Sequence, residues 1–341
     1  MKILALGGTN FIGPPVVRQL SAMGHEVAVF HRGKTAAELP EGIQHLLGDR
    51  SELTQMKSEF ERLSPQVVVD MFPYTEADAI ALMNVFQNIA ERVVAISSMD
   101  VYRAYAVFLQ IESTPVESVP LTENSALRQQ LHLFREMAER PLNAPADYEK
   151  ILVERVVMNY PDLPGTIVRL PMVYGTQDPL NRLFPYLKRM DENRPAIVLP
   201  ESLAQWRGSY GYVENVAHAI ALAATNEHAK GRIYHVADTE LTEAERLSRV
   251  GRVAGWQGKI VTVATESLPT DWNLPYNTAQ HWFVDTTRIR QELGYSEIVS
   301  LEQALKTTID WQRSHPPTEI SPWTGKELLD YATEDQILKS I

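Results

Sequence analysis

The sequence contains no cysteine, and this absence removes several kinds of chemistry at once. Without thiols the chain forms no disulfide and has neither a cysteine nucleophile nor a zinc–thiolate site. The histidines show no His-x-x-x-His or comparable pairing, so we expect no metal centre. A chain without cysteine is compatible with a reducing compartment, and a cytoplasmic location is the expectation.

Positive charge and long apolar runs are also scarce. The 43 acidic residues outnumber the 32 lysines and arginines and give a formal net charge of −11, whereas nucleic acids are bound by basic surfaces. We therefore expect no nucleic-acid partner. No apolar run approaches the ~18 residues of a membrane-spanning helix, and no basic leader with a longer apolar stretch opens the chain, so we expect neither membrane insertion nor secretion.

A glycine-rich turn near the N-terminus is the strongest pattern that is present. The apolar run 2–6 leads into this turn, a helical pattern follows from near Phe11 to Gly24, and 26–30 reads as a second strand. Unpaired N–H groups and the dipole make the start of such a helix a site for a pyrophosphate, so the βαβ context predicts a dinucleotide site rather than an ordinary turn. The residues expected to form it are Gly7, Thr9, Asn10, Phe11, Ile12 and Gly13.

The end of the second expected strand carries His31, Arg32 and Lys34 and no carboxylate. In this kind of site a carboxylate at that place binds the ribose of NAD, whereas an arginine holds the 2′-phosphate of NADP. The alternative is a plain solvated basic loop. The cluster favours NADP as the cofactor, with NAD as the second choice.

Strand-like and helix-like segments alternate through the first half of the chain. We expect strands that end at Gly48 and cover 66–71 and 92–96, with helices over 53–63 and 76–90. This alternation predicts an α/β fold with a doubly wound parallel sheet, which binds ligands beyond the carboxyl ends of its strands. The expected division is a Rossmann-type domain over 1–175, completed by about 208–237, and a smaller substrate-binding lobe over 176–341 that ends in a polar surface tail.

Several motifs resemble those of the extended short-chain dehydrogenases, the NAD(P)-dependent epimerase/dehydratase family. The spacing of Gly7, Asn10 and Gly13 is similar to G-x-x-G-x-x-G with the middle glycine replaced, and residues 97–102 resemble Ser-Ser-x-x-Val-Tyr. The resemblance covers about residues 1–312. It implies an NAD(P)-dependent oxidoreductase, epimerase or dehydratase that acts on a hydroxyl or carbonyl of a small substrate, for which a nucleotide sugar is one candidate.

The resemblance also implies roles for single residues. Ser98 would hydrogen-bond the substrate oxygen, Lys150 would hold the nicotinamide ribose, and Asp49 would meet the adenine amino group. Arg207 lies about one residue out of register with an arginine that grips the substrate diphosphate in sugar-nucleotide members. The other positions expected along the cofactor are Arg50, Met71, Phe72 and Pro171.

The chain departs from the family at the catalytic tyrosine. Tyr-x-x-x-Lys requires a tyrosine where this chain has Ala146, and Tyr148 stands only two residues before Lys150. Two helical residues differ by about 200° in direction, so Tyr148 needs an irregular helix start, with Asp147 as the expected N-cap. We expect Tyr148 to reach the cleft and exchange the proton, with Tyr105 or Asp100 as substitutes on the substrate side.

The segment between Tyr102 and Asp147 is longer than the family pattern and is expected to cover the active site with a helix over 127–140. Tyr102 and His132 are further residues there that could supply a proton. The missing tyrosine leaves two rivals open: a dinucleotide-binding sensor without catalysis, and an RNA-associated protein, against which the net charge counts. A homodimer is one assembly open to such a chain.

Overall fold

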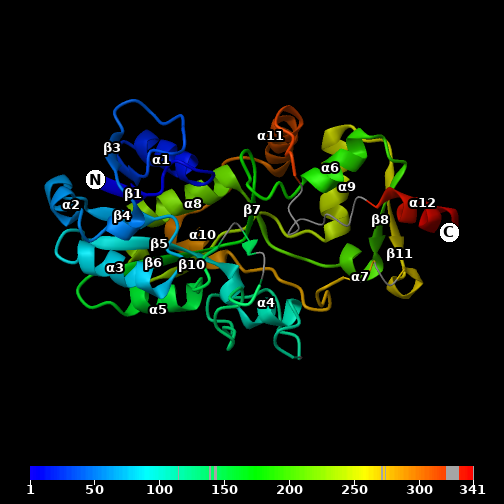
Figure 1. The fold of residues 1–341 in the computed structure, drawn as a ribbon, viewed down its shortest axis with the longest axis horizontal. Coiled ribbons are helices and arrows are strands. Elements are labelled where there is room, and N and C mark those ends of the chain that lie inside the picture. The colour runs from blue at the N-terminus through cyan, green and yellow to red at the C-terminus, as the bar shows by residue number, and fades with distance from the viewer. Residues whose placement is uncertain are drawn as a thin grey trace.

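The computed structural model describes residues 1–113, 115–137, 140–141, 144–269, 272, 274–319 and 330–340. Figure 1 shows an elongated molecule, in which a larger lobe holds the N-terminus and the central sheet and a smaller lobe holds the C-terminus. Within the described part of the chain, no helix combines the length and the apolar character needed to cross a bilayer.

A seven-stranded parallel sheet with the order β10-β6-β5-β4-β1-β2-β3 forms the core of the larger lobe. The doubly wound α/β fold expected from the sequence is confirmed. The strands β1 and β4 are buried along almost their whole length, because helices cover both faces of the sheet, and this explains their unbroken apolar character. The strands are β1 (Lys2–Leu6), β2 (Glu26–His31), β3 (Gln44–Leu47), β4 (Val67–Asp70), β5 (Arg92–Ser98), β6 (Gly165–Leu170) and β10 (Ile233–His235).

Side chains of β1 alternate between the two faces of the sheet. Ile3 and Ala5 pack in one apolar cluster with α1 (Gly13–Ala22) and α8 (Val213–Thr225), whereas Leu4 and Leu6 pack in a second cluster on the other face. The helices that contribute to this second cluster are α2 (Lys57–Leu63), α3 (Glu76–Phe86) and α5 (Lys150–Asn159).

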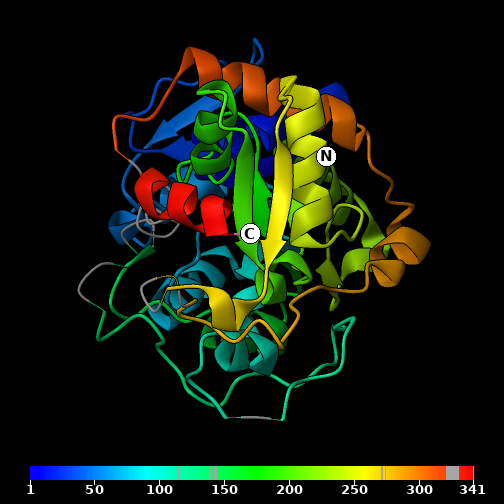
Figure 2. The same cartoon turned by 90° about the vertical axis from the view of Figure 1, so that its right-hand side faces the viewer.

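The smaller lobe is built on a parallel pair of strands, β8 (Ala196–Pro200) and β11 (Lys259–Val263). Figure 2 shows this pair side by side, with helices on either side of it. A second short pair, β7 (Met172–Tyr174) and β9 (Tyr210–Tyr212), connects the lobes. The remaining α-helices are α4 (Arg103–Phe108), α6 (Phe184–Asp191), α7 (Glu201–Ala204), α9 (Glu243–Ala254), α10 (Thr287–Leu293), α11 (Leu301–Ser314) and α12 (Tyr331–Ser340).

The C-terminal helix α12 is packed against the smaller lobe, so the predicted surface tail is wrong for residues 330–340. The Glu334 carboxylate is fully buried, pairs with the guanidinium of Arg189, and lies 3.0 Å from Nη2 of Arg194. Its Oε1 also accepts a hydrogen bond from the backbone N–H of Val198 at 2.9 Å, and Ile337 packs on the same strand. Residues 320–329 lie outside the described residues.

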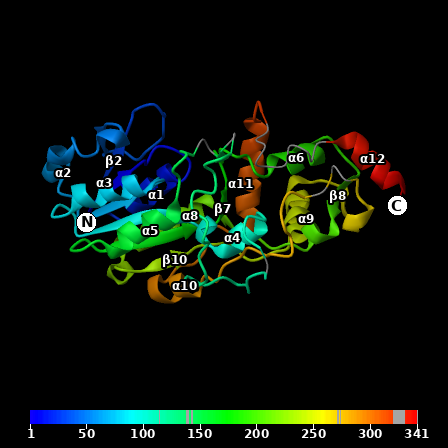
Figure 3. The same ribbon diagram turned by 60° about the horizontal axis from the view of Figure 1, so that its bottom comes forward.

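The helix expected over 127–140 is absent from the described residues of that range, which form turns and irregular backbone. Long-range backbone hydrogen bonds replace it: the N–H of Arg103 donates to Ala126, and the N–H of Arg128 donates to Val101, at 2.9 Å each. The segment therefore runs antiparallel beside the turn that follows β5. Figure 3 shows α4, which begins at that turn, lying between the two lobes.

Candidate active site

The glycine turn brings backbone and ring into contact at the carboxyl end of β1. Gly7 has φ 91°, and a Cβ at this residue would lie 2.0 Å from the ring of Phe72. A Cβ on Gly13 would lie 2.6 Å from the carbonyl oxygen of Gly7. Neither position accommodates a side chain, so the turn is fixed close to the start of α1.

The donors that this turn offers to an anion come from its backbone. The helix α1 begins at Gly13, later than expected, and its N-cap Ile12 makes no side-chain capping bond. Pro14 and Pro15 have no N–H to offer, and no described residue accepts a hydrogen bond from the N–H of Phe11 or Ile12. The first N–H groups of a helix have no partner within the helix and are free to bind an anion, so this partly exposed turn fits the pyrophosphate of a dinucleotide. Thr9 and Asn10 lie in the same turn, where Gly13 N–H donates to the Asn10 carbonyl at 2.8 Å.

The basic residues after β2 do not act alike. Nδ1 of His31 accepts from the Gly33 N–H at 3.1 Å, and Nε2 lies 2.8 Å from Nδ1 of His45. Burial and the neighbouring His45 lower the pKa of His31, which is therefore neutral near pH 7. Arg32 and Lys34 remain as exposed cations, and their charges, after hydrogen bonds from Ser51, help to lower the pKa of the nearby Asp49.

The Arg50 side chain is paired with two carboxylates near the carboxyl end of β4. Its guanidinium donates two hydrogen bonds of 2.7 Å to the fully buried Asp70 and lies 2.9 Å from Asp78. It also lies 5.1 Å from the ring centre of Phe72, whose N–H donates to Asp70. Because both carboxylates engage it, the Arg50 side chain supports the turn that follows β4, which includes Met71, and a contact of Arg50 with the cofactor stays a prediction.

A cavity of about 1130 Å³ lies beyond the carboxyl ends of β5 and β6 and is closed by side chains of both lobes. It brings together Ser98, Asp100, Tyr105, Tyr148 and Pro171 of the expected site residues. The other polar and aromatic residues that line it include Tyr74, Phe108, Phe134, Arg182, Tyr186, Trp206, Tyr210, Glu243, Arg246, Trp272, Tyr276, Trp282 and Asp330.

Tyr148 reaches this cavity from a turn, not from the helix. Its N–H donates to the Pro145 carbonyl at 3.0 Å, and α5 begins only at Lys150, with Glu149 rather than Asp147 as the N-cap. The Tyr148 hydroxyl donates to Oδ2 of Asp100 at 2.7 Å. Burial and this carboxylate raise the pKa of Tyr148 well above its usual range.

Asp100, Ser98 and Lys150 surround that tyrosine. Asp100 is 6% exposed, burial raises its pKa, and its Oδ1 has no hydrogen-bond partner among the described residues. The Ser98 hydroxyl oxygen accepts from the Asp100 N–H at 3.1 Å, which leaves its own proton to donate. Nζ of Lys150 donates to the carbonyls of Pro73 and Ile96, and burial lowers the pKa of Lys150 to about 8. We refer to Ser98, Asp100, Tyr148 and Lys150 as the cavity cluster.

Two positioning residues of this cluster escaped the sequence analysis. Arg128 and Glu149 form a buried bidentate pair with bonds of 2.7 and 2.8 Å. Nε of Arg128 also donates to the Asp100 carbonyl at 2.9 Å, and Glu149 accepts from the Ile151 N–H at the start of α5. Through this pair, the inserted segment is linked to Asp100 and to the start of α5, which flank Tyr148. Arg128 and Glu149 are far apart in the sequence, and no local pattern indicates a contact between them.

Tyr102 and His132, the further proton sources considered, are not among the residues that line the cavity. The Tyr102 hydroxyl is buried between Nε2 of His235 and Nη1 of Arg169. Arg169 in turn makes a bidentate pair of 2.9 and 2.7 Å with Glu154. Tyr102 therefore serves packing, and we refer to Tyr102, Glu123, Glu154, Arg169 and His235 as the anchor cluster.

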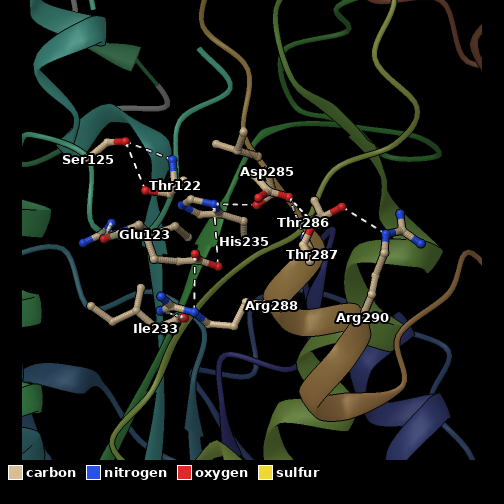
Figure 4. Close-up of polar contacts among 12 residues, drawn as sticks. Thr122, Glu123, Ser125, Ile233, His235, Asp285, Thr286, Thr287, Arg288 and Arg290 are labelled. Atoms are coloured by element: carbon tan, nitrogen blue, oxygen red, sulfur yellow. Dashed lines mark hydrogen bonds and ion pairs between the residues drawn. The ribbon is translucent and has the colours of Figure 1, made fainter. Parts of the chain in front are cut away.

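Figure 4 shows the outer end of this anchor cluster, where Glu123 from the inserted segment points at His235 and Arg288. Oε1 of Glu123 lies 3.8 Å from Nδ1 of His235, and Oε2 lies 3.5 Å from Nε of Arg288. Nδ1 of His235 donates to the Asp285 carbonyl at 3.0 Å. The cluster fixes the inserted segment to the edge strand β10.

The structure does not bring Arg207 to the cavity. Its guanidinium is half-exposed and pairs with Glu240 at 2.6 Å, while the adjacent Trp206 lines the cavity instead. The arginine of this region that lines the cavity is Arg246 on α9, stacked at 4.3 Å over the ring of Tyr210 and paired with Glu243. Ion pairs with the spacing of Glu243 and Arg246 are common on helices, so no sequence pattern indicates that this pair lines the cavity.

A family model described as the NAD dependent epimerase/dehydratase family matches residues 3–237. The chain is 25% identical to a 2′-dehydrokanamycin reductase of Streptomyces kanamyceticus, over 84% of this chain and 75% of that protein. It is 24% identical to the chloroplast stem-loop binding protein of 41 kDa b of Arabidopsis thaliana, over 99% and 84% respectively.

Solved structures share the fold. A UDP-glucose 4-epimerase from Thermotoga maritima, solved with UDP-glucose, superimposes with a TM-score of 0.64 at 18% identity, covering 92% of this chain and 99% of that one. Within the described part of the chain, no group of histidine, aspartate and glutamate side chains is arranged to hold a metal ion.

Proposed function

The chain belongs to the NAD dependent epimerase/dehydratase family, and from this premise we propose that it is an NADP(H)-dependent oxidoreductase that interconverts a hydroxyl and a carbonyl on a small substrate. When bound, the nicotinamide supplies or accepts the hydride. Epimerisation through a transient ketone is the same chemistry run in both directions. The observation that carries the proposal is the hydrogen bond from Tyr148 to Asp100 in the wall of the cavity.

The cavity cluster supplies the proton that must match the hydride. In the oxidation direction, Ser98 holds the substrate oxygen, Tyr148 takes the proton of the substrate hydroxyl, and the Tyr148 proton passes to Oδ2 of Asp100. In the reduction direction the same two transfers run backward and place a proton on the carbonyl oxygen. Because Tyr148 gains one proton as it loses another, it stays neutral, which suits a phenol whose pKa is raised.

Lys150 has the position of the ribose-holding lysine but a different neighbourhood. Its Nζ lies 5.8 Å from the ring centre of Tyr148, and two of its protons are donated to backbone carbonyls. One N–H remains for a ribose hydroxyl. The Asp100 carboxylate accepts the hydrogen bond of the Tyr148 hydroxyl and raises the pKa of Tyr148, which is the opposite of what a nearby lysine charge does, so it serves as the proton acceptor behind the phenol.

Arg32 and Lys34 support NADP over NAD, because both are exposed beside the turn and no carboxylate occupies the end of β2. We expect Arg32→Ala to weaken NADPH binding by about 1.5 to 3 kcal/mol, the loss of a charge-assisted hydrogen bond, and to leave NADH nearly unchanged. Calorimetric titration of both cofactors measures this. Equal weakening of both would remove the argument for NADP.

The substrate is a small molecule, and a nucleotide sugar is one candidate, because a solved structure of the same fold holds UDP-glucose. A second candidate comes from the reductase relative, whose name describes an oxidised aminoglycoside. In the first candidate the reacting group would be a hydroxyl of the sugar ring, and in the second it would be a carbonyl. A screen of NADPH oxidation with a panel of keto-sugars, with and without a nucleotide, tests the proposal, and no turnover with any of them would favour a sensor.

RNA association is a second function, favoured by the resemblance to a stem-loop binding protein. The net charge of −11 opposes it, because each phosphate contact needs a cation. A filter-binding titration with a structured RNA at 50 and 200 mM salt measures this directly. We expect no saturable binding at the higher salt.

A further inference from the structure

The cations that line the cavity are already matched by carboxylates. Nε and Nη2 of Arg246 donate to the two carboxylate oxygens of Glu243, a residue that is only 5% exposed. Burial alone would lower the pKa of Arg246, but the Glu243 charge raises it, so the pair is fully ionised and has no net charge. Nη1 of Arg182 donates to Oδ1 of the buried Asp178 at 2.7 Å and also to the Val173 carbonyl.

Two further carboxylates, Asp100 and Asp330, line the same cavity. Both arginines of the described lining, Arg182 and Arg246, have carboxylate partners, and the ammonium of Lys150, which has none, donates to two backbone carbonyls and is not among the lining residues. A diphosphate carries about two negative charges, and a desolvated anion is costly unless cations pair with it. The lining therefore opposes a diphosphate rather than attracting it.

Aromatic rings supply most of the remaining wall. The ring of Phe108 is stacked between Trp206 and Tyr276, with centre distances of 5.1 and 4.7 Å. Tyr105 lies 4.7 Å from Trp282 on the same side. Flat ring faces bind the C–H faces of sugars and cyclitols and attract a cation held above them.

We propose that the substrate of this cavity is a neutral or positively charged ring polyol, such as a glycoside or an amino sugar, that carries no phosphate. The carboxylates of Asp100 and Glu243 accept hydrogen bonds from its hydroxyl or ammonium groups, and the rings of Trp206 and Trp282 cover its apolar faces. This inference rests on the proposed function, since it names the substrate class of the same cavity.

The experiment compares probes that share one sugar ring and differ in charge. The full-length protein, saturated with NADPH, is titrated with phenyl β-glucoside, its 2-amino-2-deoxy analogue, its 6-phosphate and UDP-glucose, and binding is followed by calorimetry. The expected order is the amino sugar at least as tight as the neutral glucoside, and both about tenfold or more tighter than either phosphorylated probe, the ratio given by one unpaired charge.

A matched pair of variants tests the cause. Glu243→Gln leaves the Arg246 charge without its partner, so UDP-glucose binding is expected to improve about tenfold relative to phenyl glucoside. Glu240→Gln makes the same change beside Arg207, outside the cavity, and is expected to leave the ratio unchanged. The wild-type titrations stand on their own if Glu243→Gln does not fold.

UDP-glucose binding that is tighter than that of the neutral and amino probes would overturn the inference, and so would the absence of binding by both of these probes at millimolar concentration. These readouts do not require turnover. A protein that binds the neutral probe in the expected order but never oxidises NADPH would refute the proposed function and leave the substrate class standing.

Discussion

The cavity cluster and the anchor cluster both contact one short segment, residues 97–102, and each contains a tyrosine, of which Tyr102 is fully buried and Tyr148 is partly buried. The Tyr148 hydroxyl donates to one oxygen of the Asp100 carboxylate, and the other oxygen, Oδ1, has no hydrogen-bond partner among the described residues. Tyr102 lies between an imidazole and a guanidinium and does not line the cavity. Burial raises the pKa of both phenols.

The difference shows that a raised pKa does not mark the reactive tyrosine here. What separates the two is access from the cavity and a neighbour that can accept a proton. His235 beside Tyr102 is a residue type that can accept a proton, but both of its ring nitrogens are already hydrogen-bonded, Nδ1 to the Asp285 carbonyl and Nε2 to the Tyr102 hydroxyl. The Tyr102 hydroxyl is bonded on both sides within the anchor cluster, which holds a segment in place, whereas Oδ1 of Asp100 beside Tyr148 has no partner among the described residues and can bind a ligand.

The strongest test of this comparison exchanges the two tyrosines for phenylalanine. We expect Tyr148→Phe to lower kcat by about 10² to 10⁴, because a positioned proton donor is lost, and Tyr102→Phe to change kcat by less than about threefold. NADPH oxidation with a substrate found in the keto-sugar screen measures both, and the NADPH dissociation constant is the control. A larger loss of kcat in Tyr102→Phe would reverse the two assignments.

The anchor cluster is expected to show itself in stability instead. Glu154→Gln leaves the buried Arg169 charge without its bidentate partner, which should lower the free energy of unfolding by about 3 to 5 kcal/mol. Urea denaturation measures it. Glu240→Gln, which breaks the exposed pair with Arg207, is the matched control and should cost at most about 1 kcal/mol. Similar losses in both variants would mean that the buried pair has no special role.

Asp100→Asn sharpens the comparison within the cavity cluster. Asparagine can accept the hydrogen bond of Tyr148 but cannot take its proton, so kcat should fall about tenfold to hundredfold, less than in Tyr148→Phe. The pH profile of kcat for NADPH oxidation is the second readout. In this direction Asp100 must carry the proton that it gives to Tyr148, so the wild-type rate falls as the pH rises through the pKa of Asp100, and this basic limb should disappear in the variant. An unchanged rate and profile would restrict Asp100 to a structural role.

The smallest expected effect is a pH dependence of stability from the anchor cluster. Burial lowers the pKa of His235 to about 3, whereas an unfolded histidine titrates near 6.5. Below pH 6.5 the unfolded chain binds a proton that the folded chain excludes, so stability is lost as the pH falls and is unaffected above that value. Between pH 7 and 5.5 we expect His235 to account for a loss of roughly 1 kcal/mol.

Urea denaturation at the two pH values, on the wild type and on His235→Gln, measures this contribution. Glu123, Arg169, Arg288 and Asp285 face the imidazole and remain in both proteins. Burial raises the pKa of Glu123 and raises the pKa of Asp238 to about 6, and both proteins keep these groups, so the difference between the two proteins isolates His235. The same pH dependence in both proteins would assign it to other groups.

The cofactor half of the molecule was predictable because its signals are local. Strand, glycine turn and helix follow one another within residues 2–24, and the ring of Phe72 meets Gly7 only because a parallel sheet places strand ends together. Each of these steps follows from apolar periodicity and from residues with special backbone freedom. The predicted sheet and the position of the turn are confirmed for this reason.

The substrate half depends on contacts between distant residues. Arg128 abolishes the expected helix because its backbone and side chain bond to Val101, Asp100 and Glu149, and helical propensity cannot reveal those partners. Likewise the acidic C-terminal residues predict an exposed tail from sequence alone, because nothing local indicates that Glu334 pairs with Arg189. For Arg207 and Arg246, only the packing of the folded chain shows which side chain lines the cavity: Arg246 does and Arg207 does not.

Strand β10 is the last strand of the central sheet to be synthesised, so the sheet is incomplete until β10 is made. It pairs with β6, but residues 171–232, which contribute to the smaller lobe, are synthesised between the two strands. At about 5 to 20 residues per second, β6 remains an unpaired sheet edge for roughly 3 to 12 seconds after it is made, and Tyr102 and Arg169 have no His235 to contact until β10 is made. An open edge of a hydrophobic sheet pairs readily with other chains. A ribosome-bound chain halted inside this interval therefore exposes the surface on which aggregation of the nascent protein would begin.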